Sequence, residues 1–286
     1  MTAARREYRS PHLSHGGDRL AVTIGPLFEA DVWVIDLMRD TLTRLTFNRG
    51  ETPIWTPDDQ RVTYAQLTGG DAGILWKPVD GSGQEEALVA ADDPLLMMGS
   101  MIPFSWSPDA RTLVFRQRRE SGRADDIGVL SMEGDRKPEL LAETVFAEAH
   151  PVLSPDGRWL AYASDESGRR EVYVRSFLEA GGRWQISTEG GAEPRWNPAG
   201  KEIFYRRGDE MWAVSVATEP SFQPGRPTLL FEGSFDSGGY FHNYDVSPDG
   251  KRFMMVQREE SSESAPDRLH VVLHWFEELE RRVPVN

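Results

Sequence analysis

Cysteine is missing from this chain of 286 residues, so disulfides, thiolate catalysis and zinc-thiolate sites are excluded. No apolar stretch reaches the roughly 18 residues that a membrane-spanning helix needs. Residues 1–8 are partly basic but are not followed by the apolar segment of a signal peptide. We therefore expect a cytoplasmic chain with no membrane association, while the compartment of a longer parent protein stays open.

Basic residues are fewer than acidic residues in this sequence. The chain has 32 Lys and Arg against 46 Asp and Glu, a formal net charge of −14. Such a surface repels nucleic-acid backbones and anionic lipid, so neither is expected as a partner. The ordinary interpretation of this charge is a solubilising surface, and we expect a monomer. Attraction of cations into a focused cleft is the alternative.

Helical patterns are scarce. The exception is residues 275–282, where apolar residues recur at helical spacing and Arg281 and Arg282 stand at the C-terminal end before Pro284. Basic residues are favourable at that end of a helix dipole. We predict a short amphipathic helix that caps the end of the chain.

A tight turn followed by an alternating apolar strand recurs along the sequence. The clearest copy is Ser154-Pro155-Asp156-Gly157, in which Pro presets the turn, Asp bonds the nearby backbone and Gly accepts a positive φ. We call the first residue of each copy its anchor. The six anchors are Ser14, Thr56, Ser107, Ser154, Asn197 and Ser247. A spacing of about 40 to 50 residues is typical of propellers and solenoids.

Each repeat contains several short strands separated by polar hairpins, as in the third strand of the fourth repeat, residues 171–175. Four short antiparallel strands per repeat indicate a propeller blade. We predict an all-β, six-bladed propeller with four-stranded antiparallel blades and a short C-terminal helix. It forms a single domain, 1–286, with blades at 8–50, 51–99, 100–146, 147–190, 191–238 and 239–286. Residues 1–7 are expected to close the last blade, although they contain few strand-forming residues.

Two rows of residues are expected to face the channel, because the first strand of each blade lines the axis and residues two apart share a strand face. The minus-four row, four residues before the anchors, is Ser10, Thr52, Pro103, His150, Glu193 and Asn243. The minus-two row is His12, Ile54, Ser105, Val152, Arg195 and Asp245. The minus-one row is apolar throughout and is expected to pack between blades: Leu13, Trp55, Trp106, Leu153, Trp196 and Val246.

The sequence carries a family resemblance in its repeated Ser-Pro-Asp-Gly turns, in residues 165–174 and in residues 182–191. These segments resemble TolB-like propellers, and more narrowly the propeller that follows the catalytic domain in many bacterial serine/threonine protein kinases. Residues 243–250 and 272–279 are similar to the C-terminal part of that group. The resemblance implies a binding module that is detached from a larger signalling protein. The kinase domain of that group is absent from this sequence.

Known catalytic motifs are missing from the sequence. It has no Gly-x-Ser-x-Gly elbow, no His-Glu-x-x-His, no EF-hand spacing, and neither the Gly-rich loop nor the His-Arg-Asp motif of a kinase. The repeated Asp109, Asp156 and Asp249 are interpreted as turn residues rather than catalytic carboxylates. A kinase or a Ser-His-Asp peptidase is therefore not expected.

The polar members of the two rows suggest a channel site. His150, Glu193, His12 and Asp245 are candidate ligands of one divalent metal ion, since imidazole and carboxylate suit zinc, manganese or calcium. Candidate ligand-binding residues at the channel rim are Arg195, Asn243, Glu51 and His242. Each has a structural alternative: His150 could bond a neighbouring blade, and Glu193 could pair with Arg195 or with another blade.

Two main functions remain open at this point. The first is a non-catalytic module that binds a protein or a small molecule on one propeller face, and a lectin-like role is a variant of it. The second is a metal-dependent hydrolase of esters, lactones or phosphoesters, by architectural analogy with six-bladed lactonases that hold an axial metal. On the second hypothesis, His150→Ala or Glu193→Ala is expected to abolish turnover and leave the fold intact.

Overall fold

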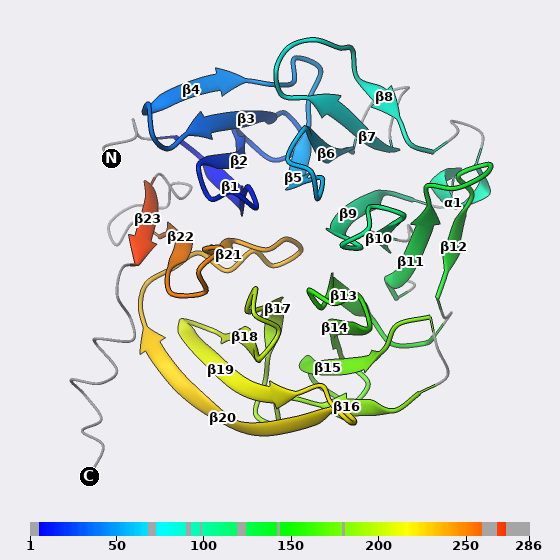
Figure 1. Cartoon of the computed structure of the whole chain (residues 1–286), viewed down its shortest axis with the longest axis vertical. Coiled ribbons are helices and arrows are strands. Elements are labelled where there is room, and N and C mark those ends of the chain that lie inside the picture. The colour runs from blue at the N-terminus through cyan, green and yellow to red at the C-terminus, as the bar shows by residue number, and fades with distance from the viewer. Residues whose placement is uncertain are drawn as a thin grey trace.

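The computed structural model describes residues 6–67, 73–89, 93–97, 99–118, 124–141, 144–178, 181–258 and 268–272. Six antiparallel sheets surround one axis, and the first strand of each lies innermost (Figure 1). The all-β propeller predicted from the repeats is therefore confirmed. Five sheets have four strands, and the sixth has three strands within the described residues.

The first three blades occupy the N-terminal half of the chain. Blade 1 consists of β1 (Tyr8–Leu13), β2 (Arg19–Ile24), β3 (Asp31–Asp36) and β4 (Thr41–Arg44); blade 2 of β5 (Glu51–Trp55), β6 (Arg61–Gln66), β7 (Gly73–Pro78) and β8 (Glu86–Ala87); and blade 3 of β9 (Met101–Trp106), β10 (Thr112–Gln117), β11 (Asp126–Ser131) and β12 (Pro138–Leu140). A four-residue helix, α1 (Pro94–Met97), precedes blade 3.

The last three blades complete the ring. Blade 4 consists of β13 (Glu148–Leu153), β14 (Trp159–Ser164), β15 (Glu171–Ser176) and β16 (Arg183–Gln185); blade 5 of β17 (Ala192–Trp196), β18 (Glu202–Arg207), β19 (Glu210–Ala217) and β20 (Gln223–Glu232); and blade 6 of β21 (Tyr244–Val246), β22 (Phe253–Gln257) and β23 (Arg268–Val272). The predicted helix at 275–282 lies outside the described residues, and so do residues 1–5 of the predicted closing segment.

The repeated turns join the first and second strands of the blades. In blade 4, the Ser154 hydroxyl donates to Asp156 and accepts the Trp159 N–H at 3.0 Å, while the Gly157 N–H donates to the Ser154 carbonyl at 2.8 Å. The Ser107 and Ser247 turns repeat the hydroxyl-to-aspartate bond. The interpretation of Asp109, Asp156 and Asp249 as turn residues is confirmed.

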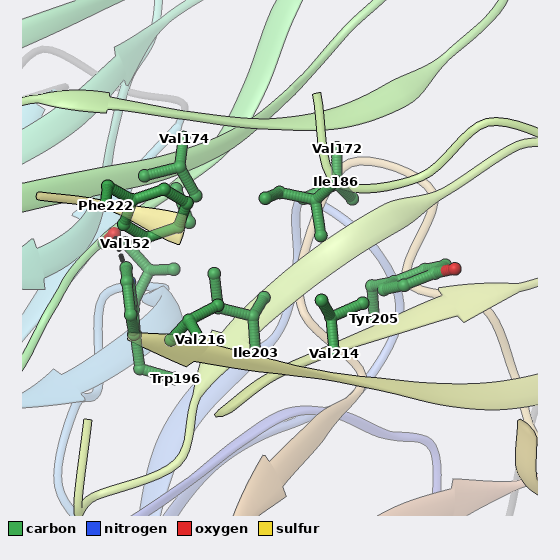
Figure 2. Close-up of a cluster of buried hydrophobic side chains, with 11 residues drawn as sticks. Val152, Val172, Val174, Ile186, Trp196, Ile203, Tyr205, Val214, Val216 and Phe222 are labelled. Carbon is green, nitrogen blue, oxygen red and sulfur yellow. Dashed lines mark hydrogen bonds between the residues drawn. The ribbon is translucent and has the colours of Figure 1, made fainter. Parts of the chain in front are cut away.

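The core lies between neighbouring blades rather than at one centre. Figure 2 shows the cluster between blades 4 and 5, where Val172 and Ile186 of blade 4 face Ile203 and Val214 of blade 5. All four side chains are almost completely buried. Because each blade covers its apolar face only against the next blade, this burial stabilises the ring as a whole.

A one-residue bulge interrupts the innermost strand of blades 1, 2, 4 and 5. In each case a residue with positive φ stands just before a proline: Ser10 (49°), Thr52 (52°), His150 (54°) and Glu193 (54°). The strand pairing shifts by one residue at the same places. A bulge adds an unpaired residue and changes the direction of the side chains around it. Simple alternation, which predicted that the minus-four and minus-two rows share one strand face, is therefore interrupted at these four strands.

No helix within the described ranges is long and apolar enough to cross a membrane.

Candidate functional site

A cavity of about 440 Å³ opens at the end of the channel that carries the repeated turns. Every residue of the minus-two row and of the minus-one row lines it, together with Phe104 and five of the turn prolines. This size lies within the range of small-molecule sites, which are mostly apolar with a few polar groups. The prediction that the first strands line the axis is confirmed.

Three tryptophans of the minus-one row form much of the apolar wall. They are buried between blades, as predicted, and each indole N–H donates to the preceding blade: Trp55 to the His12 carbonyl (2.9 Å), Trp106 to the Thr63 hydroxyl (3.1 Å) and Trp196 to the Val152 carbonyl (3.2 Å). These bonds hold the rings in place, so the wall is formed in advance of any ligand.

The ionisable residues of the minus-two row are Arg195, Asp245 and His12, which line the cavity from three consecutive blades, 5, 6 and 1. Asp245 Oδ2 accepts the Leu13 N–H at 2.7 Å, and its Oδ1 lies 3.6 Å from Arg195 Nε. The Arg195 and Asp245 side chains are only 9% and 11% exposed. Asp245 thus joins blade 6 to blade 1 and also balances the charge of Arg195.

His12 is neutral at pH 7. Burial lowers its pKa to about 4, Arg195 acts in the same direction, and Asp245 opposes both. Desolvation disfavours the charged imidazolium because the surrounding protein replaces water poorly. The one fully charged pair in the wall of the cavity is therefore Arg195 and Asp245.

A second, much smaller hollow of about 20 Å³ shares Ile54, Phe104 and Arg195 with this cavity. His242 lines only the small hollow, together with three residues of the minus-four row: Ser10, Thr52 and Pro103. The volume of the small hollow is close to what one water molecule requires. The larger cavity is accordingly the part of the channel with room for a ligand.

An aromatic cluster lies beyond Phe104. The ring centroids of Phe104, His150 and His242 are 5.2 to 5.8 Å apart. His242 Nε2 is 3.0 Å from the Pro194 carbonyl. Neither His150 nitrogen has a hydrogen-bond partner among the described residues, although the Phe241 backbone is close enough to favour its protonated form. Burial holds both histidines' pKa values well below 6.5.

Glu193 and Asn243 connect blades instead of facing the cavity. The two carboxylate oxygens of Glu193 accept the N–H groups of Gly238 (3.0 Å) and Asn243 (2.9 Å). Asn243 Oδ1 accepts the Ser10 N–H at 2.9 Å. Burial raises the pKa of Glu193, while Arg206 and these N–H groups oppose the rise. The sequence left open whether Glu193 pairs with Arg195 or with another blade. The structure shows the second.

Glu51 lies apart from the cavity. Its Oε1 accepts the Phe28 N–H at 2.6 Å, and its Oε2 is 3.8 Å from Arg9 Nη2. Burial raises its pKa. Glu51 therefore supports the loop between β2 and β3. Of the eight candidate residues, the structure brings His12, Arg195 and Asp245 together at the cavity and places His150 and His242 behind Phe104.

A metal site is not assembled in the part of the chain that the structure describes: no group of three or more His, Asp or Glu side chains is placed to hold an ion. Glu193 and His150 are buried rather than exposed at a rim. The two oxygens of Glu193 accept backbone hydrogen bonds, so its removal is now expected to lower the stability of the fold, contrary to the sequence-based expectation.

Sequence reasoning missed Phe104, which lines both hollows of the channel and contacts the rings of His150 and His242. A signal was present, because Phe104 occupies the position at which four other blades have proline: Pro11, Pro53, Pro151 and Pro194. A large aromatic residue in place of a repeated proline indicates that this position has a different role in blade 3 from its role in the other blades. In blade 3 the bulge falls at Phe104 itself, between Pro103 and Ser105.

Fold and site together define a class of protein: a six-bladed antiparallel propeller with an open cavity at one end of its channel. Residues 51–236 match the TolB beta propeller domain, and the chain belongs to this family.

Similar proteins of several kinds share the fold. A putative TolB from Agrobacterium tumefaciens has a TM-score of 0.66 at 17% identity, over 93% of this chain and 90% of that one. An oligogalacturonate lyase in complex with manganese has a TM-score of 0.62 at 14% identity, over 96% and 76%. Dipeptidyl-peptidase 5 of Porphyromonas gingivalis is 22% identical over 171 residues, 54% of this chain and 24% of the peptidase. The chain thus spans about a quarter of that relative's length.

Proposed function

We propose that this chain is a non-catalytic binding module, and that its binding site is the cavity at the turn end of the channel. The observation that carries the proposal is the cavity itself, with its fixed tryptophan wall and three polar residues from adjacent blades. Preformed, mostly apolar hollows with few polar groups are where proteins bind ligands. Membership of the TolB beta propeller family supports the proposal, and so does the structural similarity to a putative TolB.

The test is to fill the cavity. Val152 lines it and is buried, so Val152→Phe places a ring into the hollow, whereas Val145→Phe makes the same change at an 85% exposed side chain. A library of fluorinated fragments is screened by ¹⁹F NMR against the unaltered chain and both variants. We expect fragments that bind the unaltered chain and the Val145→Phe variant but not the Val152→Phe variant. Fragments that bind the Val152→Phe variant as well as they bind the unaltered chain would show that the binding site lies elsewhere.

A metal-dependent hydrolase is the second candidate. The observation in its favour is the pair of neutral histidines, His150 and His242, with ring centroids 5.2 Å apart and both His150 nitrogens without a described partner. The manganese complex of the structurally similar lyase adds weight to it. The described residues do not fit an ion as they stand, because Glu193 would first have to give up two backbone hydrogen bonds.

Elemental analysis of the purified chain decides between the two candidates, together with thermal unfolding with and without a chelator. A stoichiometric divalent ion whose removal lowers Tm would support the hydrolase, because a ligand that binds only the folded state stabilises it. Esters, lactones and phosphoesters would then be assayed. A metal-free chain whose Tm does not change with the chelator would reject the hydrolase, and the binding module would remain as the one candidate.

A further inference from the structure

The wall of the cavity is divided into two chemically different halves. At the same position of the repeat, blades 2, 3 and 4 contribute Ile54, Ser105 and Val152, whereas blades 5, 6 and 1 contribute Arg195, Asp245 and His12. Phe104 adds to the apolar half. A ligand that suits both halves has an apolar body and one polar end.

Arg195 is the polar residue with the most unused hydrogen-bonding capacity. No described residue accepts a hydrogen bond from its guanidinium, and its buried Nε has only Asp245 nearby, at 3.6 Å. Asp245 already accepts the Leu13 N–H. Buried donors are normally satisfied, and a guanidinium presents paired N–H groups that match the two oxygens of a carboxylate.

The surroundings also favour an anion. Arg195 and Arg116 are both among the groups that lower the pKa of His150, and Arg195 also lowers that of His242. Among the described residues, Asp245 is the only carboxylate that lines either hollow. The arginines therefore act as positive charges at His150 and His242, whereas at His12 the effect of Asp245 exceeds that of Arg195. Walls of low dielectric concentrate such a field inside a cleft.

We infer that the cavity binds an amphiphilic carboxylate: Arg195 pairs with the carboxylate, and the apolar body of the ligand lies against Ile54, Phe104 and Val152. The inference rests on the proposed function and gives its ligand a chemical class. A small organic acid and the C-terminal carboxylate of a peptide share this chemistry.

The experiment compares 4-phenylbutyrate with its neutral amide, and a short peptide ending in phenylalanine with the same peptide amidated. Binding is followed by the fluorescence of the wall tryptophans and by calorimetry. We expect each acid to bind about tenfold to a hundredfold more tightly than its amide, which is the usual strength of a charge-assisted hydrogen bond. The acid that binds more tightly identifies the source of the carboxylate.

Two variants connect this preference to the residues. Arg195→Gln combined with Asp245→Asn removes both charges and keeps an acceptor for the Leu13 N–H; it should abolish the preference for the acid, so that acid and amide bind equally. Asp245→Asn alone should tighten acid binding, because it removes the competing carboxylate. Arg111→Gln, a change at an exposed arginine, should alter neither.

Three results would overturn the inference: equal binding of acid and amide, an acid preference that survives in the double variant, or no saturable binding of any acid at millimolar concentrations. Equal binding of acid and amide that is blocked by Val152→Phe would leave the proposed function standing and reject only the carboxylate. Failure of every fragment and every acid to respond to Val152→Phe would reject both.

Discussion

In the minus-four row, Glu193 accepts two backbone N–H groups, and Asn243 accepts a third from the neighbouring blade. In the minus-two row, the Arg195 guanidinium has no described acceptor within hydrogen-bond distance and faces an open cavity. The two rows carry the same kinds of polar residue. What separates them is whether the backbone of the next blade already satisfies the side chain, and this difference separates residues that hold the ring together from residues available to a ligand.

Glu193→Ala should give the largest effect, because it leaves the N–H groups of Gly238 and Asn243 without their acceptor. We expect a loss of about 3 kcal/mol in the free energy of unfolding, since each buried group left unpaired costs about 1–3 kcal/mol. Chemical denaturation measures it, and Glu189→Ala, at a side chain that is 75% exposed, is the control. Equal stability of the two variants would show that Glu193 does not hold neighbouring blades together.

Acidification should destabilise the fold through the buried histidines of the channel, one in each row and His242 beside them. The folded-state pKa of His12 is lowered from 6.5 to about 4, and those of His150 and His242 are lowered well below 6.5. Below pH 6.5 the unfolded chain therefore binds protons that the folded chain does not, so stability falls as pH drops toward the folded-state pKa.

For His12 alone, this loss should be about 2 kcal/mol at pH 5 relative to pH 7. Urea denaturation at the two pH values checks it, with His12→Gln as the matched variant. The variant should lose less stability than the unaltered chain over this interval. An identical pH dependence in both proteins would show that His12 titrates normally.

Gly157→Ala should have the smallest effect and tests whether the turns, rather than the axial side chains, hold the entrance of the cavity. Gly157 has a φ of +72°, and a Cβ there would meet Pro108 Cδ of the preceding blade at 3.1 Å. Gly168→Ala adds a Cβ at a φ of +90° with nothing within 4 Å. Both changes carry backbone strain of about 1 kcal/mol.

The difference in Tm between these two glycine variants reports the contact between blades. We expect Gly157→Ala to have the lower Tm. Equal Tm values would mean that Pro108 makes room for the added Cβ without cost, and that the two turns are not tightly packed.

The spacing of the turns was enough to predict the propeller, since Pro, Asp and Gly each impose a local backbone conformation that needs no tertiary information. The minus-two row was also placed correctly at the axis, because Arg195, Asp245 and His12 follow from counting back from each anchor. Counting failed for His150 and Glu193, because strand alternation takes no account of the extra residue that a bulge inserts. Their neighbours on other blades, such as Gly238, lie far away in sequence and have no local signature.

The glycine and proline of the turns have a consequence for what can enter the cavity. At three blade junctions a Cβ on the turn glycine would come within 4 Å of the turn proline of the preceding blade: Gly17 and Pro248, Gly157 and Pro108, Gly200 and Pro155. The absence of a side chain at these glycines thus lets neighbouring turns stand close together around the entrance. A larger residue there would push two blades apart at the end where the cavity opens, so the width of the entrance depends on atoms that are not there.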